Sequence, residues 1–305
     1  MTTADGKQAV EEVFEQGTSF NDIINLYVLD RELRLFLLGP VEKIEIALRG
    51  KIISHIGNNS DRGDEGFQTI KLFARHHYNL TNNRNKRLYN NIVHKGRGEV
   101  VAYLKDAIRS EKNEDAKKGL QSDLEELQKL KDVDKIADVI NEYSPYHIMH
   151  RISFGVLVNI FNILHQKYAD AISQEFGFHT RPLRSVLSTL IEVRNACAHH
   201  EPIWFRSPKT MVFPREYYPE IYQDITKEML ADPSQLQDAL PKQGLYVTCA
   251  AMHLLLNRIS ETTTWYARFK PLIYRFQFGM QSRMGFPRDW DELPFWRGPL
   301  PPMEE

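Results

Sequence analysis

Cysteine is scarce in this chain of 305 residues, which contains only Cys197 and Cys249. Two cysteines cannot form the framework of a disulfide-rich fold, and their surroundings do not suggest a zinc site. A reducing compartment therefore suits the sequence best. We expect neither a structural metal nor any other cofactor.

Long apolar runs are also missing. No stretch approaches the roughly 20 residues that a helix needs to cross a bilayer. The first eight residues, Met1 to Gln8, are polar and lack the apolar core of a secretory signal. The sequence therefore predicts a cytoplasmic protein without a membrane partner.

An excess of charge of one sign is absent too, because 39 Lys and Arg residues face 40 Asp and Glu residues, for a formal net charge of −1. This balance gives no global signal for nucleic acid or membrane binding, so contact with RNA would have to come from local basic patches. One basic stretch is a weak RNA-binding candidate, and it comprises Arg84, Lys86, Arg87, Lys95 and Arg97.

Glycine and proline are modest, at 16 and 15 residues, so broad disorder is not indicated. Alternating apolar patterns typical of strands are missing, whereas apolar residues recur three or four apart over much of the chain. These patterns predict an all-α fold with loops at 57–66 and 201–220. Helices are expected from Ser19 to Leu37, from Gly39-Pro40 to about Ile56, from Ser144 to Leu164, on to Phe176, from Pro182 onward, and from about Pro233 to Arg268.

We expect residues 1–305 to form a single domain with two unusual parts. Residues 105–135 carry dense charge of both signs, and their few leucines lie three or four apart. This segment is predicted to be a helical insertion, either a thin amphipathic helix or a hairpin outside the main core. Residues 271–305 are rich in aromatic rings and are expected to form an extended tail packed on the helices.

One motif has residue types suited to chemistry, namely Arg194-Asn195-Ala196-Cys197-Ala198-His199 at the end of the helix that opens at Pro182. On a helix, Asn195 and His199 share a face because they are four residues apart. The three small residues between them would let another helix or an RNA backbone approach closely. The pattern R-N-x-x-x-H is moderately specific by itself.

These residues suit RNA cleavage by the neighbouring 2′-hydroxyl. That reaction needs a base, an acid and positive charge beside the phosphate. Histidine suits the first two tasks because its ordinary pKa, about 6.5, lies near neutral pH. Arginine suits the third through its paired donors. One chain supplies one motif, so two chains related by symmetry would supply the second histidine.

Other interpretations compete with this one. Arg194 and His199 could simply complement a helix dipole. His199-His200-Glu201 lacks the spacing of a helical metal site, and Cys197 is better explained as a small packing residue. Glu45 and Arg49 are either a surface ion pair or a pair whose carboxylate orients a catalytic side chain.

The chain resembles the Abi-like proteins of bacteria, the abortive-infection group also called Abi-D/F. Three blocks carry the resemblance in order between Ser19 and Trp204. They are Tyr27 to Arg34 with Val41 to Arg49, then Ser153-Phe154-Gly155, then Arg194 to Glu201 with Ile203-Trp204. One departure is Met149-His150-Arg151-Ile152, where such proteins often have an acidic residue just before the second block.

This resemblance implies a branch of the HEPN superfamily, with a four-helix bundle core and metal-independent RNA cleavage between two facing motifs. Arg194 and His199 would be the catalytic pair and Asn195 a polar helper. We expect support from Arg34, Glu45, Arg49 and His200. The implied role is phage defence through RNA damage, in some relatives together with a small antitoxin RNA.

Our main hypothesis is therefore an endoribonuclease toxin that acts as a homodimer. Two alternatives remain open. The first is a non-catalytic HEPN module that binds RNA or a partner protein, and the second is a purely structural helical protein.

Overall fold

The computed structural model describes residues 18–58, 71–204, 206, 211, 244–260, 263–287, 290–292 and 294–297. In these ranges the chain is helical, and the only β-type pairing is the isolated bridge between Tyr78 and Leu164. The all-α prediction is confirmed. The elements are α1 (Phe20–Asn58), η2 (Arg75–His77), α2 (Asn83–Ser110), α3 (Glu114–Lys129), α4 (Val133–Ile140), α5 (Pro145–Arg151), α6 (Phe154–Ile163), α7 (Gln166–Glu175), α8 (Thr180–Ala198), α11 (Leu245–Ile259), α12 (Trp265–Tyr274), α13 (Phe278–Arg283), η4 (Trp290–Glu292) and α14 (Pro294–Arg297).

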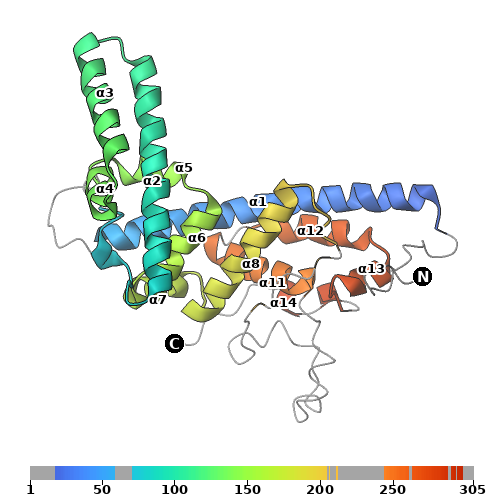
Figure 1. Ribbon diagram of the computed structural model, residues 1–305. Helices are drawn as coiled ribbons and strands as arrows, with labels where there is room; N and C mark the ends of the chain where they lie inside the picture. The colour runs from blue at the N-terminus through green and yellow to red at the C-terminus, as the bar shows by residue number, and fades with distance from the viewer. Residues whose placement is uncertain are drawn as a thin grey trace, which may run out of the picture.

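The long helix α1 lies along the whole molecule, and α6, α7, α8, α11 and α12 pack on it (Figure 1). The predicted interruption at Gly39-Pro40 is wrong, because α1 continues through Pro40 to Asn58. A proline inside a helix removes one hydrogen bond. Here one unbroken apolar stripe on both sides of Pro40 is buried against the other helices, which favours a continuous helix. The stripe consists of Leu33, Leu37, Val41, Ile44, Leu48 and Ile52.

Helices α2 and α3 form an upright hairpin at one end of α1 (Figure 1). The side chain of Asn82 caps α2 by accepting from the backbone N–H of Asn85, and Asn113 caps α3 in the same way. The charged segment 105–135 falls on the last turns of α2, on α3 and on the start of α4. Leu127 is the fully buried residue of α3.

The single helix expected from Ser144 to Leu164 is instead two helices, α5 and α6, which are separated at Ile152 and Ser153. Both Ile152 and Ser153 have extended backbone angles, and the side chain of Ile152 is buried. The short helix that follows is confirmed as α7, and the one that opens near Pro182 is confirmed as α8.

The C-terminal part differs most from expectation. The long helix predicted to Arg268 is interrupted at Ser260, where α11 has ended and before α12 begins, and residues 233–243 lie outside the described residues. The tail predicted to be extended contains α13, η4 and α14 within its described part. Its described rings do pack inward, since Trp290 and Trp296 are buried against Phe269, and Phe295 is buried against His253. Among the described helices, none has the length and apolarity required to span a membrane.

Two buried histidines should make stability depend on pH. Burial lowers the pKa of His77 to about 4, helped by the neighbouring charges of His76 and Lys167, and burial also lowers the pKa of His253 to about 4. Their ordinary pKa is 6.5. Between these two pKa values the unfolded chain binds more protons than the folded chain. The folded state is therefore fully stable with respect to these two histidines above pH 6.5, and it loses that stability as the pH falls toward 4.

We therefore expect the free energy of unfolding to fall by about 2 kcal/mol per histidine between pH 7 and pH 5. Urea unfolding followed by circular dichroism at the two pH values measures this difference. In His253→Phe, which lacks one of the two histidines, the difference in unfolding free energy between the two pH values should be about 2 kcal/mol smaller. An unchanged pH dependence in that variant would contradict this assignment.

Candidate active site

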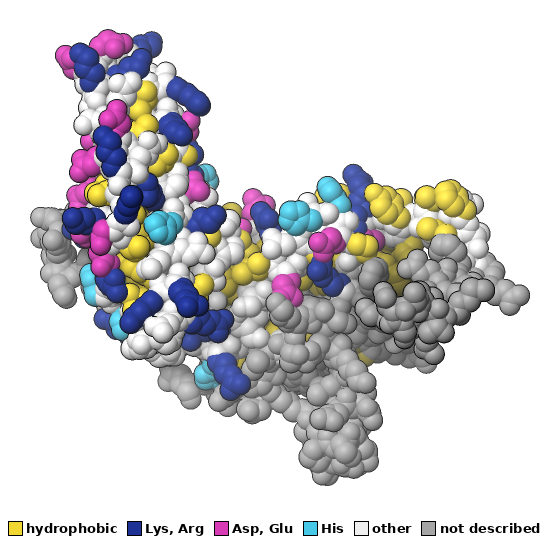
Figure 2. Space-filling model, in the orientation of Figure 1, with side chains coloured by type: hydrophobic (Ala, Val, Ile, Leu, Met, Phe, Trp, Pro, Cys, Tyr) yellow, Lys and Arg dark blue, Asp and Glu magenta, His cyan; other side chains and the backbone are white. Residues whose placement is uncertain are grey.

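The predicted catalytic motif lies at the C-terminal end of α8, where this helix crosses the middle of α1 (Figure 1). One face of α8 is buried through Leu183, Leu187 and Leu190. The opposite face leaves Arg194, Asn195 and His199 exposed. Nη1 of Arg194 donates to Oδ1 of Asn195 over 3.5 Å. Over this crossing, Figure 2 shows histidine and Lys or Arg side chains together with Asp or Glu side chains.

The end of α8 is a Schellman turn built without glycine. The N–H of Glu201 donates to the carbonyl of Ala196 at 2.9 Å, and the N–H of His200 donates to that of Cys197 at 3.4 Å. His200 has φ +61°, the left-handed conformation that usually calls for glycine at this position. His199 is the last residue before this turn, and its N–H still donates to the carbonyl of Asn195 at 2.9 Å.

This turn also sets the position of His200. On a continuing helix, His200 would have lain about 100° beyond His199. The helix has already ended at Ala198, so the position of His200 follows from the turn. Since glycine is absent, the sequence offered no standard signal of this helix end.

A buried carboxylate on α1 holds the chain immediately after the motif. Oδ1 of Asp30 accepts from the backbone N–H of Ile203 at 2.8 Å and from that of Trp204 at 3.1 Å. Its other oxygen pairs with Arg34 one turn along α1, and both side chains are about 4% exposed. Arg34, expected to support the site, is therefore buried and acts through Asp30. Asp30 itself was missed, although its spacing from Arg34 is that of a helical ion pair.

The small residues of the motif pack inside their own chain. Ala196 is 1% and Cys197 4% exposed. Burial raises the pKa of Cys197 to about 11, so its thiol stays protonated at neutral pH. The packing interpretation of Cys197 is confirmed. The expected surface of three small residues is wrong, because only Ala198 remains exposed.

The pair Glu45–Arg49 connects α1 to the junction of α5 and α6. Nη2 of Arg49 donates to Oε1 of Glu45 at 2.6 Å and to the carbonyl of Ile152 at 3.3 Å. The pair is thus partly buried and also binds the backbone, so it does more than form a surface ion pair. Just beyond the junction, a side chain at Gly155 would meet Cγ2 of Ile191 on α8 at 4.0 Å, one turn before Asn195. The three sequence blocks therefore meet around α1.

The five basic residues proposed to bind RNA all lie on α2. Arg84, Lys86, Arg87 and Lys95 are exposed. Arg97 instead donates to the carbonyls of Leu130 and Gln128 at 3.0 Å and 2.7 Å, which ties α2 to the end of α3. It is thus committed to helix packing and is the weakest RNA-binding candidate of the five.

The chemistry of the motif is that of an exposed arginine and an exposed histidine beside an amide. Within the described ranges, no three His, Cys, Asp or Glu side chains are grouped so that they could hold a metal ion. Arginine can bind a phosphate and histidine can carry a proton at neutral pH. These groups can act on a phosphodiester that approaches the end of α8.

Comparison with known proteins gives one match. The chain matches the family described as Abi-like protein over residues 4–205, a range that contains all three blocks and α8. Searches of the curated proteins and of the solved structures returned no match. Because the matched range covers more than half of the 305 residues, the chain belongs to the Abi-like protein family.

Proposed function

We propose that this protein is a metal-independent endoribonuclease that serves phage defence as an abortive-infection toxin, built on a HEPN-type bundle. Family membership supports the defence role. The exposure of Arg194, Asn195 and His199 together at the end of α8 carries the proposal of catalysis. The contacts of the buried Asp30 with the backbone of Ile203 and Trp204, here called the Asp30 clamp, support this proposal. They stabilise the chain next to the exposed groups.

In the proposed reaction, the 2′-oxygen attacks the adjacent phosphorus and the bond from phosphorus to the 5′-oxygen breaks. One histidine accepts the proton of the 2′-hydroxyl, and another donates a proton to the departing 5′-oxygen. Arg194 stabilises the charge on the phosphate oxygens. The products are a 2′,3′-cyclic phosphate and a 5′-hydroxyl.

Two histidines imply two copies of the chain. An exposed apolar face on the N-terminal half of α1 supports a homodimer, and it consists of Phe20, Ile24, Tyr27 and Val28, which are 39–74% exposed. Tyr27 lies three residues before Asp30 on α1, so this face begins about one helical turn from the carboxylate that holds the chain after α8. A two-fold pairing across it would bring two copies of the motif together.

The proposed partners are an RNA substrate, a second copy of the chain and a small regulatory RNA. The alternative function is a non-catalytic HEPN module that binds RNA or a protein. It is favoured by the balanced charge of the chain, which provides no general attraction to RNA.

The deciding experiment incubates the purified chain with RNA in the presence of EDTA. We expect cleavage to persist, because arginine and histidine supply the charge and the proton transfers. The ends should be 2′,3′-cyclic phosphates, identified by mass spectrometry. Cleavage that EDTA abolishes and a divalent ion restores would overturn the mechanism, and intact RNA under all conditions would favour the binding module.

A further inference from the structure

A groove lies in the corner between α1, α2 and α5, and none of the motif residues line it. Its volume is about 630 Å³. In Figure 1 this corner is where the upright α2–α3 hairpin meets α1, and α5 lies within it. Its lining consists of Arg49, Ile53, Tyr103, Tyr146, His150 and Arg151.

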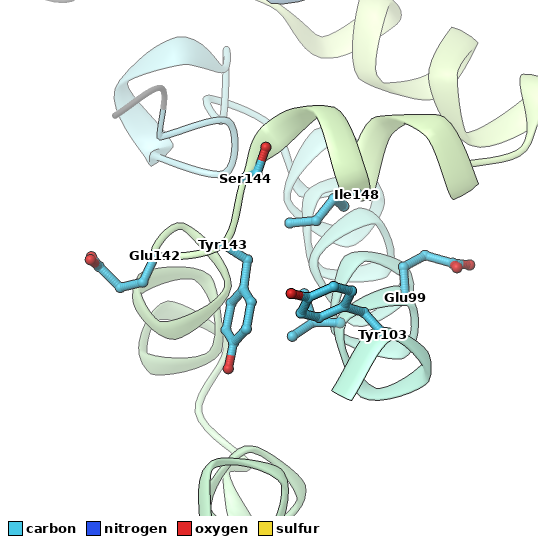
Figure 3. A pocket seen from close by; sticks show the side chains of 7 residues that line it. Glu99, Tyr103, Glu142, Tyr143, Ser144 and Ile148 are labelled. Carbon is cyan, nitrogen blue, oxygen red and sulfur yellow. The ribbon is translucent and has the colours of Figure 1, made fainter. Parts of the chain in front are cut away.

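The lining combines aromatic rings with donor groups. Tyr103 is 37% and Tyr146 46% exposed, so part of each ring faces solvent. Tyr143 packs against the ring of Tyr103, with the two ring centroids 6.2 Å apart. Figure 3 shows these two rings side by side, with Glu99 and Glu142 directed away from them. Tyr103 is thus positioned by its neighbour.

The donors are arginines and a histidine. Nε of Arg49 is buried and has no hydrogen-bond partner among the described residues. Arg151 pairs with Asp106 at 3.2 Å and Arg49 with Glu45 at 2.6 Å, so both charges are already partly balanced. His150 is exposed at the end of α5. The groove therefore offers directed donors and rings more than net positive charge.

We propose that this groove binds an unpaired nucleotide of single-stranded RNA, and the proposal rests on RNA being the substrate of the motif on α8. Exposed tyrosines stack on bases of any sequence, and arginines donate to the neighbouring phosphates. A base inside a duplex has both faces covered by its stacked neighbours, so the groove selects single strands.

The groove and the motif are joined through the same backbone. Arg49 donates to the carbonyl of Ile152, and the helix that follows packs on α8 one turn before Asn195. Both sites lie along the same upper side of α1 in Figure 1. A strand held in the groove can therefore continue along α1 to the motif.

The test measures RNA binding in the full chain carrying His199→Ala, which prevents cleavage during the measurement. The probe is a fluorescein-labelled oligouridine of twelve nucleotides, followed by fluorescence anisotropy. Tyr146→Ala should weaken binding about ten-fold, the scale of one lost stacking contact. Tyr146→Phe keeps the ring and should bind within about two-fold of the parent. Arg151→Ala should cost less, about three-fold, because Asp106 already shares its charge.

Two matched controls lie elsewhere on the molecule. Tyr274 is 49% exposed on α12, and Arg75 pairs with Asp134 much as Arg151 pairs with Asp106. Tyr274→Ala and Arg75→Ala should bind like the parent. Two results would contradict nucleotide binding in the groove. One is an equal loss of RNA affinity in Tyr146→Ala and Tyr274→Ala, and the other is equal affinity for duplex RNA of the same length.

These outcomes separate the groove from the nuclease. If the chain cleaves RNA while the groove variants bind as well as their controls, the groove proposal fails and the nuclease stands. If the groove variants lose binding but the wild-type chain leaves RNA intact, the groove stands and the chain is an RNA-binding module.

Discussion

Replacing His199 with alanine is expected to lower the rate of RNA cleavage by at least about 100-fold, the usual effect of removing a general acid or base. Arg194→Ala should cost a similar factor, because nothing then offsets the charge on the phosphate. Both side chains are exposed at the end of α8, so neither change should disturb the core. Cleavage of a labelled RNA under single-turnover conditions measures both rates.

Two other histidines serve as controls. His165→Ala removes an exposed histidine next to α7 and should leave the rate unchanged. His200→Gly places glycine at φ +61°, where it relieves roughly 1 kcal/mol of backbone strain, and should cost less activity than His199→Ala. If His200→Gly abolishes cleavage while His199→Ala does not, the catalytic histidine has been assigned wrongly.

The His199→Ala chain also tests the proposed composite site. When it is mixed with wild-type chains under subunit exchange, mixed dimers should lose most activity, because each site needs a histidine from both copies. Total activity should then fall faster than the wild-type fraction. A strictly linear fall, or full activity in a monomer, would show that one chain carries a complete site.

Replacing Asp30 with alanine is expected to lower the free energy of unfolding by about 3–5 kcal/mol. The change leaves the buried guanidinium of Arg34 without its carboxylate. It also removes the acceptor of two backbone N–H groups, those of Ile203 and Trp204. Urea unfolding followed by circular dichroism gives the difference from wild type.

Glu45→Ala is the matched control, since it removes the other carboxylate of an i, i+4 pair on the same helix. That pair is more exposed, at 16–21%, so its loss should cost less, about 1–2 kcal/mol. The clamp would be disproved if Asp30→Ala destabilised the chain no more than Glu45→Ala.

Sequence reasoning was sufficient where a signal is local. The apolar spacing of Leu183, Leu187 and Leu190 predicts α8, and Pro182 marks its beginning closely. The motif on the last turn of α8 followed from the same pattern, because periodicity shows where a helix runs and which residues face outward. Sequence blocks around this motif were also enough to indicate the family.

Boundaries that depend on distant packing were predicted less well. Pro40 normally ends a helix, yet the buried stripe on both sides of it favours a continuous α1. Ile152 fits a helical pattern, yet the chain is extended there, and its carbonyl accepts from Arg49, 103 residues earlier. Neither outcome is visible in a local window.

The sequence by itself determined that the protein is helical and that Arg194, Asn195 and His199 share the end of one helix, because helical periodicity is a property of neighbouring residues. Only the tertiary structure decided how that end is held. The carboxylate of Asp30 lies 173 residues before Ile203 in the chain, and folding alone brings it to that backbone N–H. The groove beside α5 arises in the same way, since its lining comes from three helices whose contact no spacing encodes.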